Sequence, residues 1–320
     1  MDTEIIQLKN VTKRFKKNLV LDGINLSIPE KQITGIIGAS GEGKSTILKL
    51  IIGFYKPTKG EVLYLRRNVL KDLKNIRTSF GFATEDGSYY EDLTVRENVF
   101  HFGRLYKMKR SELKKRVKEV LHLVELTNAE RTRAKNLSVG MKKRLDIACA
   151  IVYNPQVLIL DEPTADLDPI LRDEILNLIK KIKAHGTTVV FTTQLLEEMD
   201  KICDKIAILH NKKIVEEGNP NKIKNKYRAG NLNDVFDKIF GRRITKEEKR
   251  EDKENSGNLD TYSPESPMDI SERSNRINRN IHKPETIEKE KDNGVQGQID
   301  RTIIKSKNST IEDFGSGGTR

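Results

Sequence analysis

The sequence predicts an α/β fold, and two observations carry this prediction. Residues 1–243 alternate short β-type runs with helical patterns, which is the order typical of an α/β domain. Three of the β-type runs are almost entirely apolar, as the central strands of a parallel sheet are when both faces are covered. The expected strands are residues 24–28, 33–38, 157–160 and 188–191.

A helical segment interrupts this alternation. Between residues 94 and 125, apolar side chains recur three or four positions apart, at Leu113, Val117, Val120, Leu121 and Val124. This period places them on one face of an α-helix. We therefore expect a helical subdomain inserted at about residues 87–150.

Residues 244–320 differ in composition from the rest, because they are rich in Lys, Glu, Asn, Ser and Asp. Such a segment cannot bury enough apolar area to offset the conformational entropy that is lost on ordering. We expect a folded domain at residues 1–243 and a polar, disordered tail at residues 244–320, for which the sequence indicates no function.

Composition excludes several classes of protein. No stretch of the 320 residues approaches the roughly 18–20 consecutive apolar residues of a membrane-spanning helix, and the N-terminus lacks a secretion-signal pattern. Cys149 and Cys203 lie in apolar segments, where reduced thiols are expected. These features predict a soluble, cytoplasmic chain. The net charge of +12 is interpreted as a solvated basic surface, so nucleic acid is not expected as a partner.

A glycine-rich loop is the strongest local signal. It follows the strand at residues 33–37 and precedes an apolar helix expected at residues 47–52. In that context glycines let backbone N–H groups wrap a phosphate, and the helix N-terminus adds positive partial charge. Lys44 would contact the β- and γ-phosphates of a nucleotide, and Ser45 would bind Mg²⁺. The loop residues are Gly38, Ala39, Ser40, Gly41, Glu42, Gly43, Lys44, Ser45 and Thr46.

Two carboxylates end the buried apolar run at residues 157–160. Asp161 is expected to hold Mg²⁺, directly or through a water molecule. Glu162 would then be free to polarise an attacking water as general base. Together with the glycine-rich loop, the pair predicts a Mg-nucleotide site.

A third motif makes a family resemblance specific. Residues 137–144 read LSVGMKKR and lie about twenty positions before the acidic pair. This segment resembles the signature motif of ATP-binding-cassette (ABC) proteins, whose usual core is Leu-Ser-Gly-Gly. The resemblance covers roughly residues 4–243 and is nearest to the drug- and sodium-exporter branch. It implies a P-loop NTPase core with an antiparallel β subdomain and an inserted helical subdomain.

The resemblance also implies an assembly and a set of roles. In the family, two subunits sandwich two nucleotides head to tail, so Ser138 and Gly140 would contact the γ-phosphate held by the facing subunit. Asp168 would belong to the D-loop, and Phe15 would stack on adenine, although a role in core packing is an alternative. The family implies ATP as substrate, Mg²⁺ as cofactor, a second ABC subunit in a homodimer or heterodimer, and a separate integral membrane permease.

Three positions depart from the family pattern. Glu85 stands where the family has the Q-loop glutamine that contacts Mg²⁺, so it is a candidate third metal ligand. Gln194 stands at the switch histidine and is a candidate catalytic residue that cannot carry positive charge. Val139 replaces the first signature glycine, and its β-branched side chain would resist a positive φ.

Three functions follow as hypotheses. The first is the ATPase subunit of an ABC transporter, peripheral to the cytoplasmic face of the cell membrane. Glu162 would carry hydrolysis, and the replacement of the switch histidine by Gln194 would slow it. The second is a regulatory cassette that binds ATP but hydrolyses it weakly, because Glu85 and Gln194 replace the usual residues. The third is a soluble cassette acting on ribosomes or nucleic acid. The sequence favours the transporter subunit and leaves its cargo and direction open.

Overall fold

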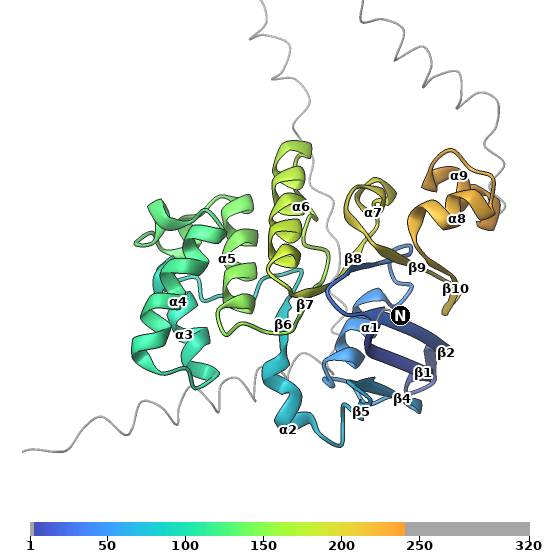
Figure 1. Cartoon of the computed structure of the whole chain (residues 1–320), viewed down its shortest axis with the longest axis horizontal. Helices are drawn as coiled ribbons and strands as arrows, with labels where there is room; N and C mark the ends of the chain where they lie inside the picture. Colours follow the sequence, from blue (N-terminus) through green and yellow to red (C-terminus); the bar gives the residue numbers. More distant parts are fainter. Residues whose placement is uncertain (1–2, 241–320) are drawn as a thin grey trace, which may run out of the picture. The chain divides into compact units, whose positions relative to one another are not determined.

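Two β-sheets organise the computed structural model, which describes residues 3–240 (Figure 1). The strands are β1 (Glu4–Phe15), β2 (Asn18–Pro29), β3 (Ile33–Ile37), β4 (Lys59–Tyr64), β5 (Arg67–Asn68), β6 (Phe80–Ala83), β7 (Val157–Leu160), β8 (Thr188–Thr193), β9 (Lys205–His210) and β10 (Lys213–Gly218). The helices are α1 (Lys44–Ile51), α2 (Leu73–Ile76), α3 (Val95–Leu105), α4 (Arg110–Leu123), α5 (Val139–Ile151), α6 (Pro169–Ala184), α7 (Leu196–Ile202), α8 (Pro220–Lys226) and α9 (Leu232–Phe240).

The larger sheet has six strands in the order β10-β9-β3-β8-β7-β6. Strands β9, β3, β8, β7 and β6 pair in parallel, and β10 is antiparallel to β9. In a parallel sheet all carboxyl ends meet at one edge, where ligands bind in α/β proteins. This topology brings the loops after β3, β6, β7 and β8 to the same edge.

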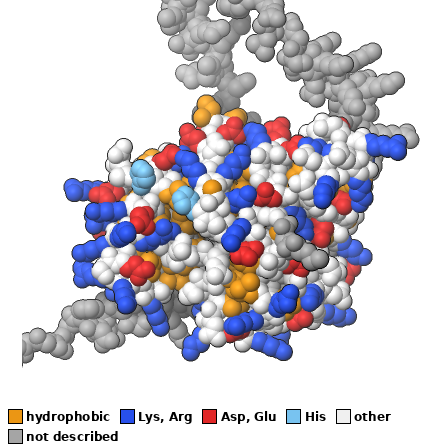
Figure 2. All heavy atoms as spheres, in the orientation of Figure 1, with side chains coloured by type: hydrophobic (Ala, Val, Ile, Leu, Met, Phe, Trp, Pro, Cys, Tyr) orange, Lys and Arg blue, Asp and Glu red, His pale blue; other side chains and the backbone are white. Residues whose placement is uncertain are grey.

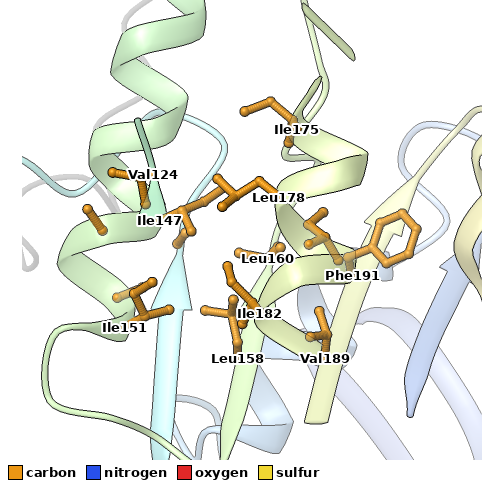
Figure 3. Packing of buried hydrophobic residues seen from close by; sticks show 14 of the residues in the cluster. Val124, Ile147, Ile151, Leu158, Leu160, Ile175, Leu178, Ile182, Val189 and Phe191 are labelled. Atoms are coloured by element: carbon orange, nitrogen blue, oxygen red, sulfur yellow. The ribbon is translucent and has the colours of Figure 1, made fainter. Parts of the chain in front are cut away.

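Alternate side chains of the central strands face two separate cores. Leu158 and Leu160 pack with α5 and α6, as the labelled side chains of Figure 3 show. Val157 and Ile159 face the opposite way, toward α1 and the antiparallel strands. Burial on both faces explains why the predicted central strands are almost uniformly apolar.

The smaller sheet has the order β2-β1-β4-β5 with every pairing antiparallel. Its buried side chains share a core with those of α1 and one face of the larger sheet. The predicted antiparallel subdomain is therefore confirmed.

Helices α3, α4 and α5 form the helical subdomain and lie together in Figure 1. The five apolar positions predicted to share a helical face are all buried. Helix α3 begins with a capping box, in which Thr94 Oγ1 accepts from Glu97 N at 3.2 Å and the Glu97 carboxylate accepts from Thr94 N at 2.8 Å. The inserted helical subdomain is confirmed.

Several element boundaries differ from the expected ones; β3, for example, ends at Ile37 and not at residue 38. The strand expected at residues 24–28 is part of the longer β2, and β8 continues to Thr193. Helix α1 begins at Lys44, before the apolar run, because Gly43 caps it with a left-handed backbone at φ 105°. A Cβ at Gly43 would lie 3.0 Å from side-chain carbons of Val20 and Leu21.

Lys and Arg side chains are interspersed with Asp and Glu over the face shown in Figure 2. This distribution agrees with a solvated charged surface. Within residues 3–240, no helix combines the length and apolar character needed to cross a membrane. The predicted tail lies outside the described residues.

Candidate nucleotide-binding site

The glycine-rich loop joins β3 to α1 at the carboxyl edge of the larger sheet. Lys44 is 4% exposed, and its Nζ donates to the carbonyl oxygens of Gly38 at 2.9 Å and Ala39 at 3.2 Å. The loop thus curls around the ammonium group. Gly38 fits this close approach because a Cβ there would lie 2.7 Å from the carbonyl oxygen of Leu209.

The remaining loop residues differ in exposure. Ala39, Ser40 and Gly41 are exposed, and Thr46 is half-buried on α1. The half-buried Glu42 carboxylate lies 3.4 Å from His210 Nδ1 and accepts from Lys212 N, so it ties the loop to the turn after β9. A cavity of about 560 Å³ adjoins the loop and is lined by residues 37–40, Gln194 and one side of α9.

Oxygen donors from three segments converge beside Lys44. Ser45 Oγ donates to Asp161 Oδ1 at 3.0 Å, and Thr192 Oγ1 donates to the same oxygen at 2.7 Å. Asp161 is 5% exposed and follows β7 directly. A hydroxyl and a carboxylate fit Mg²⁺, which binds oxygen ligands through one or two carboxylates together with substrate phosphates. The side chains of Ser45 and Asp161 therefore suit this metal.

Glu162 makes contacts to a cation and to an amide. Its Oε1 lies 3.2 Å from Lys44 Nζ, and Gln194 Nε2 lies 3.3 and 3.2 Å from its two carboxylate oxygens. The Glu162 backbone is left-handed at φ 46°, and its N–H donates to Thr192 Oγ1 at 3.0 Å. A non-glycine residue in this region stores strain, which is typical of functional positions. The structure thus brings Lys44, Glu162 and Gln194 into one cluster.

Glu85 lies in the loop after β6 and is exposed. Partial burial raises the pKa of its carboxyl, and the charges of Glu162, Asp161 and Asp86 raise it further. The Glu85 carboxyl is therefore within electrostatic range of the acidic pair. A divalent cation among these carboxylates would relieve their repulsion. No hydrogen bond of the Glu85 side chain is found among the described residues, so its role as a ligand stays a prediction.

Phe15 ends β1 and lies outside both buried cores, with 37% of its surface exposed. Its ring meets Tyr55 edge to face at a centroid distance of 5.0 Å, and Lys13 Nζ lies 4.5 Å from its centroid. The alternative of a core-packing residue therefore does not describe Phe15. The exposed part of Phe15 leaves surface available for contact with a base.

The signature residues lie on the helical subdomain. Ser138 caps α5 by accepting from Met141 N at 3.3 Å, and a Cβ at Gly140 would lie 3.2 Å from the side chain of Leu171. Val139 is the first residue of α5 and has no positive φ, so the expected conflict with its β-branched side chain does not arise. Asp168 caps α6, because its Oδ1 accepts from Ile170 N at 3.0 Å and Leu171 N at 3.1 Å.

Sequence reasoning did not identify Thr192, which links Asp161 to the Glu162 backbone through one hydroxyl. The available signal is a hydroxyl side chain near the carboxyl end of a buried apolar strand, two positions before Gln194.

Comparison with known proteins identifies the family. Residues 21–165 match the model of the ABC transporter family. The Nod factor export ATP-binding protein I of Rhizobium sp. (strain N33) is 31% identical over 236 residues, which cover 74% of this chain and 78% of that protein. The chain belongs to the ABC transporter family.

Further relatives of this ABC-family chain agree with that result. The Nod factor export ATP-binding protein I of Rhizobium meliloti is 34% identical over 215 residues, which cover 67% of this chain and 64% of that protein. The solved structure of cbiO1 from Clostridium perfringens, described as part of the ABC transporter complex cbiONQ, aligns with a TM-score of 0.66 at 27% identity. That alignment covers 78% of this chain and all of the solved chain, at 100%. At 64%, the match with the Rhizobium meliloti protein spans less than two thirds of that relative's length.

Proposed function

We propose that this ABC-family chain binds MgATP and hydrolyses it, as the ATP-binding subunit that drives a separate membrane permease. The observation that carries the proposal is the cluster of Lys44, Glu162 and Gln194 next to the Ser45–Asp161 pair. It joins a phosphate-binding cation, a carboxylate base and a metal-binding oxygen pair at one edge of the sheet. Phosphoryl transfer needs these three elements.

Each side chain has a distinct task in this mechanism. Lys44 would bind the β- and γ-phosphates, and backbone N–H groups of the loop would complete the cradle. Ser45 and Asp161 would hold Mg²⁺, which supplies charge neutralisation at the phosphates when bound. Glu162 would accept a proton from the attacking water. Gln194 would orient Glu162 and donate one neutral hydrogen bond.

Completion of the site by a second ABC subunit is part of the proposal. Ser138 and Gly140 open α5 on the helical subdomain, and the hydroxyl of Ser138 accepts a hydrogen bond within its own helix. Val139 and Ile170 are 53% and 74% exposed at the starts of α5 and α6. Apolar side chains exposed beside these helix N-termini favour contact with a facing subunit.

The membrane partner is supported by the relatives. Two of them are named as export ATP-binding proteins, and the aligned solved chain is described as part of a transporter complex. We therefore place the chain at the cytoplasmic face of the membrane. These names give no support to a cassette that acts on ribosomes or nucleic acid.

Nucleotide-driven dimerisation tests the proposal. A Glu162→Gln variant should bind MgATP and shift from monomer to dimer in size-exclusion chromatography with light scattering, because blocked hydrolysis traps the closed pair. Adding Ser138→Arg to this variant should abolish the dimer, while the monomer still binds MgATP. A Glu162→Gln protein that stays monomeric at saturating MgATP, alone and with a second cassette, would contradict the proposed assembly.

Copurification tests the partner. Expressed with its permease, the chain should pellet with membranes and remain there in high salt. A chain that instead follows ribosomes or nucleic acid at low salt and dissociates as salt rises would overturn the transport function.

A further inference from the structure

Asp146 is a buried charge with no part in the mechanism above. It lies in α5 with 3% of its surface exposed, on the helical subdomain rather than at the nucleotide site. An isolated buried carboxylate is costly unless several donors satisfy it. Its donors therefore indicate what its burial is for.

Among residues 3–240, the hydrogen-bond donors of the Asp146 carboxylate come from the loop that carries Glu85. Ser88 N donates to Asp146 Oδ1 at 2.7 Å. The Ser88 hydroxyl and the backbone N–H of Thr84 also stabilise its charged form, which offsets part of the effect of burial. One acceptor-only side chain thus binds both ends of the turn at residues 84–88.

A second side chain of α5 holds the middle of the same turn. Lys143 Nζ donates to the carbonyl oxygen of Glu85 at 2.8 Å. Lys143 and Asp146 are three residues apart and so share one face of the helix. The turn is therefore clamped by α5 at its two ends and at Glu85 itself.

The other side of this loop is fixed to the acidic pair. Asp161 N donates to the carbonyl oxygen of Ala83, the last residue of β6, at 3.0 Å. Glu85 follows two residues later, and its carboxyl experiences the charges of Asp161 and Glu162. The position of Glu85 relative to these carboxylates therefore depends on how α5 holds the turn.

We propose that Asp146, with Lys143, is a positioning residue that sets the place of Glu85 at the metal site and links it to the signature helix α5. The inference rests on the proposed hydrolytic function for its kinetic consequence. Ser138 caps the same helix, so a displacement of α5 by a facing subunit would be transmitted to Glu85 through Asp146.

Kinetic measurements on the full-length chain test the inference. Asp146→Asn keeps the side-chain volume but turns an N–H donor toward the loop, and Lys143→Met alters a partly exposed position that does not threaten folding. Each should lower kcat by about tenfold or more, as small misplacements of a catalytic group do, while KM for ATP changes by less than about threefold. Ile147→Val is the control, because Ile147 is equally deep in α5 but its apolar side chain makes no hydrogen bond to the turn; the variant should leave both constants within about twofold.

A double-mutant cycle identifies the route of the effect. In a Glu85→Ala background, Asp146→Asn should lower kcat by less than about threefold, because the group that it positions is gone. An equal loss of rate in both backgrounds would overturn the inference, since Asp146 would then act on general stability.

Hydrogen–deuterium exchange separates this inference from the proposed function. In Asp146→Asn, the amides of residues 84–90 should exchange at least about tenfold faster than in the parent, whether or not the parent hydrolyses ATP. If the parent is inactive and exchange still rises, the clamp stands and hydrolysis fails. If exchange in this segment is unchanged, the clamp itself is wrong.

Discussion

The side-chain amide nitrogen of Gln194 donates hydrogen bonds to both carboxylate oxygens of Glu162, at 3.3 and 3.2 Å. A neutral amide therefore holds the group proposed as general base. This arrangement can orient Glu162, but it adds no positive charge where the γ-phosphate would become more negative.

Gln194→His should raise the rate of hydrolysis. An imidazole at this position can donate to the γ-phosphate and can carry positive charge, so we expect kcat to increase by about tenfold or more. Steady-state release of phosphate measures it, with Gln194→Ala as the matched variant that should lower kcat. An unchanged or lower rate in the histidine variant would show that the amide is not what limits turnover.

Phe15→Ala should weaken ATP binding through loss of base stacking. Such aromatic contacts contribute about 0.5–1.5 kcal/mol, so Kd for ATP should rise by about two- to tenfold. Phe54→Ala is the control, because Phe54 also contacts Tyr55 edge to face, at 5.1 Å, and is 58% exposed. Equal effects of the two substitutions on the calorimetric Kd would argue against stacking by Phe15.

Thr192→Val should reduce both stability and kcat. The substitution keeps the shape but leaves the Glu162 N–H and Asp161 Oδ1 without this hydroxyl, at a cost of about 1–3 kcal/mol of unfolding free energy. Thr34→Val is a suitable control, because the hydroxyl of Thr34 is buried without a hydrogen-bond partner among residues 3–240. Chemical denaturation should find the Thr34 variant neutral or stabilised. An equal loss of unfolding free energy in both variants would mean that the hydrogen bonds of the Thr192 hydroxyl do not stabilise the fold.

Much of the fold was predictable because burial on two faces leaves a clear trace. Strands β3, β7 and β8 were found from apolar runs, and α4 from its helical period. Strands β4, β5 and β10, of which β5 and β10 lie at sheet edges, were not identified, since their exposed positions interrupt such runs. The family resemblance supplied the antiparallel subdomain, which composition alone did not indicate.

The candidate site was predictable where chemistry and chain order coincide. Lys44, Ser45, Asp161 and Glu162 belong to two short motifs, and the structure brings them together. Thr192 and Asp146 were not singled out, because their hydrogen-bond partners lie in loops far away in the sequence. The pairing of β7 with β8 brings Thr192 to Asp161, and the packing of α5 against β6 brings Asp146 to the loop after β6.

The stability of the chain should depend on pH through Asp146. Burial raises the pKa of its carboxyl from 3.8 to about 6, although Lys143 and the hydrogen bonds from residues 84 and 88 oppose the shift. The folded state therefore binds a proton more tightly than the unfolded state does. This stabilisation is fully present below pH 3.8 and is lost as the pH rises through about 6.

The parent should consequently lose about 2 kcal/mol of unfolding free energy between pH 4 and pH 6 that Asp146→Asn does not lose. Urea denaturation of both proteins across this range measures the difference. Parallel pH profiles for the two proteins would contradict the raised pKa.

Steady-state MgATP hydrolysis by the purified chain at high protein concentration, beside Glu162→Gln, tests the central claim most directly. We predict that the parent turns over and that Glu162→Gln lowers kcat by at least about a hundredfold while still binding MgATP. Hydrolysis by the parent that survives in Glu162→Gln would contradict the assignment of the base. A parent that binds MgATP without turnover would contradict the claim that this chain is itself an ATPase.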